Sequence, residues 1–253
     1  MINSAIIKKE IKENFFVMKG SLWLFIVALL FSVIALCFVS IQDLSMLAQS
    51  DIITTFSKLV IVIGCLITII LAATSFSNEK EQNTLESLLL TTVSKHEIAI
   101  GKLISIILMW LAVFILSIPY IIALGEGSSV SVSIIRSVFI TGTLIVVIVA
   151  LIATTLSIIL LSSKNAIVTS IILFIIVAVP GFLPKAVIKS SAGSLLGYLS
   201  PLSSAFNILK SVATQNVNTS IATTGFYIAI LVWVLIGTFI MNYGIKKIEI
   251  RGE

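Results

Sequence analysis

The chain has 253 residues, of which 58% are hydrophobic and 11% are charged, and its mean hydropathy is +1.21. This composition excludes a soluble globular domain and indicates a polytopic membrane protein. The formal net charge of +5 favours contact with anionic lipid at a membrane surface and argues against nucleic acid as a partner.

The first 20 residues show helical periodicity, with one apolar and one charged face. Ile7, Ile11 and Phe15 fall on the apolar face, and neighbouring lysines fall on the other. We expect residues 1–20 to form an amphipathic helix in the plane of the inner leaflet, with Glu10 on its exposed side. An ordinary juxtamembrane helix would show the same periodicity.

Six apolar runs follow, and each is long enough to cross a bilayer as a helix. Such a crossing needs about 20 apolar residues. The runs lack the alternating pattern of a membrane barrel, so helices are the structure that satisfies the backbone in lipid. The sequence therefore predicts one all-α transmembrane domain over residues 1–253. Its predicted spans are residues 22–41, 59–76, 103–124, 138–161, 165–183 and 225–245.

Basic residues predict where one span begins and how the chain is oriented. Lys58 is expected at the membrane interface, because a charge at the bilayer centre costs about 2.5–3.5 kcal/mol. Of the 16 Lys and Arg residues, 11 fall on the side that holds both termini. That side is predicted to be cytoplasmic, together with the loop at residues 77–102, and the loop at residues 184–224 is predicted to be extracellular.

Several function classes lack their characteristic residues here. Ion-driven transporters usually carry charged residues within their spans, and the predicted spans contain none. Cys37 and Cys65 lie in apolar runs and His96 is the single histidine, so neither a metal site nor an intramembrane protease is predicted. The sequence has no G-x-x-x-x-G-K-[ST] phosphate loop. We therefore expect no cofactor on this chain, with any ATP and Mg²⁺ bound by another polypeptide.

A polar segment interrupts the apolar sequence on the predicted cytoplasmic side. It covers residues 79–102, EKEQNTLESLLLTTVSKHEIAIGK, and carries seven charges and the histidine. Leu85, Leu88 and Leu89 have the spacing of one face of a short helix, with Glu86 beside them. Because so short a helix is unstable alone, we expect it to bind a soluble partner through its leucines and its carboxylate.

The second half of this segment predicts the start of another helix. Ser94 and Glu97 have the spacing of a capping box. Gly101 and Lys102 follow, and they are expected at the membrane interface before the third span begins. The two helices would then form a rigid hairpin, so that a push on the first helix would move the third span.

The same segment resembles the signature of the ABC-2 type permeases, the membrane subunits of a class of ATP-binding-cassette exporters. The family pattern is an acidic residue followed by Gly-Thr-Leu-Glu, Leu-Leu, Thr-Pro-Val-Ser, Glu-Ile and Gly-Lys. Asn83 replaces the usual glycine, a mild change because Asn tolerates a left-handed turn. The proline is replaced by Thr91, or by Thr92 if the register shifts by one residue. The matching residues are Glu79, Thr84, Leu85, Glu86, Leu88, Leu89, Thr92, Val93, Ser94, Glu97, Ile98, Gly101 and Lys102.

The resemblance implies a permease that dimerises with a second copy or with a sister permease. It further implies that two ATPase subunits dock on residues 79–102 and that substrate passes between the two permeases. In the outer loop, Tyr198, Ser200 and Pro201 are similar to the family's Ser-Pro segment. The residues implied in coupling to the ATPase are Glu79, Thr84, Leu85, Glu86, Leu88, Leu89, Ser94, Glu97, Gly101 and Lys102.

Small residues mark one face of the second predicted span. Gly64, Thr68 and Ala72 repeat at intervals of four and allow close helix packing. Packing within one subunit, a dimer interface and a conduit all remain open. Three candidates for a path on the fifth span are Thr169, Ser170 and Phe174.

Two functions fit these observations. The first is the membrane subunit of an ATP-driven exporter in a bacterial plasma membrane. Its uncharged spans favour an amphipathic peptide, a lipid-linked molecule or a hydrophobic substrate. The alternative is a membrane scaffold or assembly subunit that has no conduit of its own.

Overall fold

The computed structural model describes residues 10–12, 14, 20–40, 46–84, 94–125, 131–183, 197, 199–214 and 220–246. These residues contain no strand, and six of their helices are long and apolar enough to cross a membrane. The predicted all-α polytopic fold with six spans is thus confirmed. The six long helices are α2 (Gly20–Val39), α3 (Met46–Glu81), α5 (Lys95–Leu124), α6 (Ser131–Ile159), α7 (Ser163–Phe182) and α11 (Ser220–Lys246).

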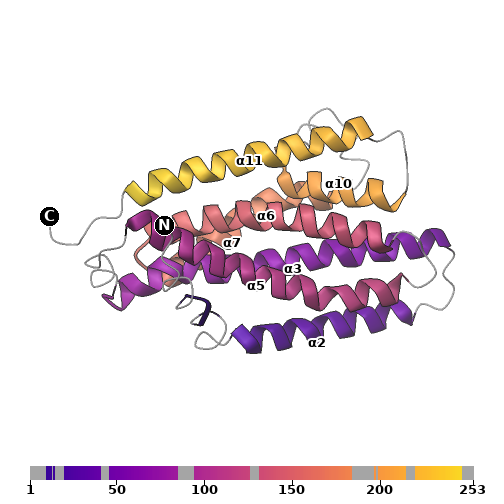
Figure 1. The fold of residues 1–253 in the computed structure, drawn as a ribbon, viewed down its shortest axis with the longest axis horizontal. Helices are drawn as coiled ribbons and strands as arrows, with labels where there is room; N and C mark the ends of the chain where they lie inside the picture. The colour runs from indigo at the N-terminus through magenta and orange to yellow at the C-terminus, as the bar shows by residue number, and fades with distance from the viewer. Residues whose placement is uncertain are drawn as a thin grey trace.

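The long helices lie roughly parallel to one another in a bundle (Figure 1). A shorter helix, α10 (Pro201–Ala213), packs against α3, α6, α7 and α11. The C-terminal ends of α3, α6 and α11 lie at the same end of the bundle as the N-terminal ends of α2 and α5 (Figure 1). We call this the loop end, because the connection between α3 and α5 begins and ends there.

Helix α3 is longer than the predicted second span and begins at Met46. At 1.5 Å per residue it is about 54 Å long, whereas the hydrocarbon core is about 30 Å thick. Lys58 therefore lies within the helix, and its expected position at the membrane interface stays a prediction. Its ammonium group lies 5.5 Å from the centroid of the Phe206 ring on α10, an arrangement in which an aromatic face stabilises a cation.

Close helix packing in the middle of the bundle is built around Trp110 on α5. Its indole ring lies against Gly64 on α3 and Gly142 on α6, and a methyl group added at either glycine would overlap the ring. The indole Nε1 donates a hydrogen bond to Thr143 Oγ1 at 3.1 Å. The small-residue face of α3 thus makes room for a bulky side chain of the same chain.

The predicted in-plane helix at residues 1–20 lies largely outside the described residues, so it stays a prediction. Residues 10–12 are helical. Glu10 contradicts the expectation of an exposed side chain, because only 5% of its surface is accessible. The reason is a cation on α5, described below.

Candidate functional site

Helix α3 ends in a turn centred on Asn83. The backbone N–H of Asn83 donates to the Lys80 carbonyl at 3.2 Å, and the N–H of Thr84 donates to the Glu79 carbonyl at 2.9 Å. Together with the φ of 54° at Asn83, these two bonds form a Schellman motif, which commonly places Gly or Asn in the left-handed position. Asn83 therefore adopts the left-handed conformation that it was expected to tolerate.

Helix α5 begins with the predicted capping box. The backbone N–H of Glu97 donates to Ser94 Oγ at 3.3 Å, and the N–H of Ser94 donates to Glu97 Oε2 at 3.1 Å. These bonds satisfy two donors that a helix N-terminus leaves without a partner. The end of α3 and the start of α5 are therefore both defined by local hydrogen bonds, and they bound the loop between them.

The predicted apolar turn in that loop, with Leu85, Glu86, Leu88 and Leu89, lies outside the described residues. Its helical conformation and its binding to a partner stay predictions. Of the other predicted coupling residues, Thr84 and Ser94 are exposed, and Gly101 is buried on α5.

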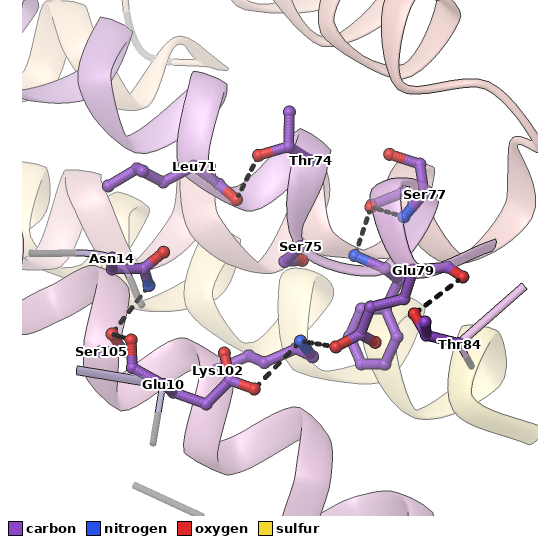
Figure 2. Close-up of polar contacts among 12 residues, drawn as sticks. Glu10, Asn14, Leu71, Thr74, Ser75, Ser77, Glu79, Thr84, Lys102 and Ser105 are labelled. Carbon is purple, nitrogen blue, oxygen red and sulfur yellow. Dashed lines mark hydrogen bonds and ion pairs between the residues drawn. The ribbon is translucent and has the colours of Figure 1, made fainter. Parts of the chain in front are cut away.

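Lys102 lies inside the protein between two carboxylates (Figure 2). Its Nζ is 2.7 Å from Glu79 Oε1 on α3 and 3.1 Å from Glu10 Oε1. The exposed fractions of the three side chains are 4% for Lys102, 6% for Glu10 and 16% for Glu79. The same ammonium group lies 5.3 Å from the centroid of the Phe76 ring. We call Glu10, Glu79 and Lys102 the charged cluster.

The charged cluster holds the N-terminal segment against α5. Ser105 Oγ donates to the Glu10 carbonyl at 3.1 Å and accepts from Asn14 Nδ2 at 2.7 Å (Figure 2). Transfer of each ion from water to a buried site costs several kcal/mol, so such charges are tolerated only when paired and hydrogen-bonded. This explains the position of Glu10: helical periodicity identifies a charged face, but it cannot tell that the face meets Lys102.

The two residues after Glu79 bind the turn between α6 and α7. Lys80 Nζ donates to the Ile158 carbonyl in the last turn of α6. The Glu81 carboxylate accepts from the backbone N–H of Ser163 at 2.9 Å and from its hydroxyl at 2.9 Å. Ser163 is the first residue of α7. A cation therefore lies at a helix C-terminus and an anion at a helix N-terminus, and both placements are electrostatically favourable.

Three consecutive residues of α3, Glu79, Lys80 and Glu81, thus contact α5, α6 and α7 respectively. The sequence reasoning identified Glu79 and Lys102, but it missed the roles of Lys80, Glu81 and Glu10. A run of three charges at the end of an apolar span could have drawn attention to Lys80 and Glu81.

The candidates within the spans have other positions. Gly64, Thr68 and Ala72 are buried within this chain. On α7, Ser170 and Phe174 line an apolar cavity of about 30 Å³ together with residues of α3, α6, α10 and α11, whereas Thr169 is exposed. A cavity of this size holds only one or two water molecules.

A family model described as ABC-2 family transporter protein matches residues 18–181. The match includes α2, α3, α5 and α6 and most of α7. It therefore contains Glu79, Lys80, Glu81 and Lys102, whereas Glu10 lies before it. No curated protein matches the chain significantly.

Proposed function

Because the chain belongs to the ABC-2 family of transporter proteins, we propose that it exports its substrate with energy from ATP hydrolysis on a separate ATPase subunit. The chain is a multi-pass membrane protein and the permease subunit of an ABC transporter. As a membrane component it is not itself catalytic. The ATPase would bind ATP and Mg²⁺.

The observation that carries this proposal is the set of contacts at the end of α3. The loop after α3 starts from a residue run that contacts α5, α6 and α7 through Glu79, Lys80 and Glu81. A force applied to the loop would therefore reach several membrane helices. A solvated connector would not need such contacts, so they favour a loop that transmits movement.

The ATPase would dock on residues 79–102. Leu85, Leu88 and Leu89 would insert into a groove of the ATPase, and Glu86 would face its basic rim. Each leucine that becomes fully buried would contribute about 1.5–3 kcal/mol to binding. The loop end would then face the cytoplasm of a bacterial cell, with both termini on that side.

Substrate would pass between two permeases, either two copies of this chain or this chain and a sister permease. The cavity beside Ser170 and Phe174 is small, which supports a path that a second subunit completes. The apolar character of the helices supports an amphipathic peptide, a lipid-linked molecule or a hydrophobic substrate. A scaffold without a conduit would bind the same partners but would move nothing.

The experiment is co-purification with the ABC ATPase that is encoded nearest to this permease. We expect the wild-type permease to retain the ATPase and to alter its rate of ATP hydrolysis, whereas the isolated permease should bind no ATP. Glu86→Lys and Leu89→Asp should abolish retention while the chain still inserts into the membrane. Full retention and unchanged ATPase activity with Glu86→Lys would refute the docking site, and ATP binding by the isolated permease would refute the separate energy source.

A further inference from the structure

We propose that Lys80 and Glu81 are positioning residues that make the end of α3 and the α6–α7 turn move as one unit when the ATPase binds nucleotide. This inference rests on the proposed function and adds a second route for movement. The first route is the chain itself, since the loop continues directly into α5. Helices α6 and α7 have no such covalent connection to the loop, so they need a non-covalent one.

The geometry supplies this connection at both sides of a short turn. Helix α6 ends at Ile159 and α7 begins at Ser163, so three residues separate them. Lys80 contacts the helix before the turn through the Ile158 carbonyl, and Glu81 contacts the helix after it through Ser163. Two adjacent side chains of α3 therefore hold the turn on both sides.

The signs of the two charges match the helix ends that they contact. The last carbonyl groups of α6 carry partial negative charge and bind the ammonium group of Lys80, and the first N–H groups of α7 carry partial positive charge and bind the carboxylate of Glu81. Ser162, the residue before α7, provides no side-chain cap for its own helix. Glu81 from another helix takes that role, which makes the start of α7 dependent on the position of α3.

Hydroxyl groups reinforce the same junction. Ser157 Oγ on α6 accepts from the backbone N–H groups of Phe76 at 3.0 Å and Ser77 at 2.9 Å. Ser77 Oγ donates to Ser163 Oγ at 3.2 Å. These bonds connect the last turns of α3 to both helices of the turn, so a displacement of the end of α3 would carry α6 and α7 with it.

The contact of Glu81 is made at an exposed position. The contact of Lys80 is partly buried. Because charge contacts near the surface contribute little to folding stability, the variants should insert and fold, and their melting temperatures in detergent check this. A double substitution, Lys80→Glu with Glu81→Lys, offers a matched test because it keeps the composition and net charge but places each charge at the wrong helix end. Asp51→Asn, at an exposed position near the other end of α3, serves as the control.

The test measures the distance between spin labels at Gln82→Cys and Asn165→Cys, two exposed positions at the end of α3 and in the first turn of α7. Cys37 and Cys65 are replaced by alanine. In the isolated permease we expect one narrow distance distribution for the parent chain and for Asp51→Asn. The charge-swapped variant should give a broader distribution that extends to longer distances. Equal distributions in the swapped and parent chains would overturn the inference without involving the ATPase.

A second measurement uses the complex with the ATPase, without nucleotide and with ATP and vanadate. A label pair at Gln82→Cys and Ser40→Cys, at opposite ends of the bundle, reports whether the loop end moves at all. We expect this distance to change while the Gln82 to Asn165 distance stays constant in the parent chain and changes in the swapped chain. A change in the Gln82 to Asn165 distance of the parent chain would refute the common movement. No change in either pair of the parent chain would instead refute the proposed function and, with it, the common movement.

Discussion

The ammonium group of Lys102 lies 2.7 Å from Glu79 Oε1, and the lysine side chain is only 4% exposed. The two residues are 23 positions apart, on different helices and on either side of the loop. Glu10 contacts the same ammonium group from the N-terminal segment. The pair thus joins the end of α3 to the start of α5, and a third element shares the contact.

Lys102→Met should strongly destabilise the protein. It removes the cation between Glu79 and Glu10 and leaves one buried and one partly buried carboxylate facing each other, and the loss of one partner from a buried ion pair typically costs about 3–5 kcal/mol. The measurement is the apparent melting temperature of the purified permease in detergent. Lys164→Met, at an exposed position, is the matched control and should change little. Equal melting temperatures for the two variants would show that the charged cluster contributes nothing to stability.

Glu10→Lys should also destabilise the protein, because it places a second cation beside Lys102. Charge reversal at the exposed Asp51, as Asp51→Lys, should be tolerated. Combining Glu10→Lys with Lys102→Glu restores opposite charges and should recover part of the loss. Protection of the N-terminal segment from added protease measures the effect directly. If Glu10→Lys is protected as well as wild type, the segment lies on the surface and the contact with Lys102 does not hold it.

Asn83 should accept glycine but not valine. The residue has a φ of 54°, a conformation that costs most L-residues roughly 1–2 kcal/mol, and a β-branched side chain is among the least tolerant there. We expect Asn83→Gly to keep or raise the thermal stability and Asn83→Val to lower it. Gln82→Val, one residue earlier and without a positive φ, separates the effect of conformation from that of side-chain type. Equal losses at the two positions would argue against the Schellman motif.

Gly64→Ala and Gly142→Ala should each disturb the packing of Trp110. The added methyl group would overlap the indole ring, and overpacking of this kind typically costs about 1–3 kcal/mol. Gly225→Ala is the control, since a methyl group there meets nothing within 4 Å. It should be neutral or stabilise the helix by up to about 1 kcal/mol. Thermal unfolding followed by Trp fluorescence would show whether the two buried glycines differ from the exposed one.

The fold class followed from the sequence because it depends on average properties of long segments. Runs of about 20 apolar residues leave the backbone no alternative to a helix in lipid, so six spans were predictable without tertiary information. Local hydrogen bonds were predictable too. Ser94 forms its capping box with Glu97, three residues away. The turn at Asn83 is closed by hydrogen bonds to the carbonyl groups of Lys80 and Glu79. Both structures therefore depend on a few neighbouring residues.

Helix boundaries were less predictable, because hydropathy detects the hydrocarbon layer and not the helix. Helix α3 continues from Met46 to Glu81, since polar residues beyond the apolar run keep the same hydrogen-bonding pattern outside the lipid. Lys58 therefore lies inside a helix that begins at Met46, although the predicted apolar span starts only after it.

The contacts of the site depend on tertiary structure alone. Glu10 and Lys102 are 92 positions apart, and Glu81 and Ser163 are 82 positions apart. Whether a charge faces solvent, a counterion or a helix end depends on which helices become neighbours, and that is decided by packing of side chains such as Trp110 against Gly64 and Gly142. The sequence by itself determined that most charged residues gather at one end of a membrane bundle. Which residue each of these charges contacts was determined only by the packing of the helices.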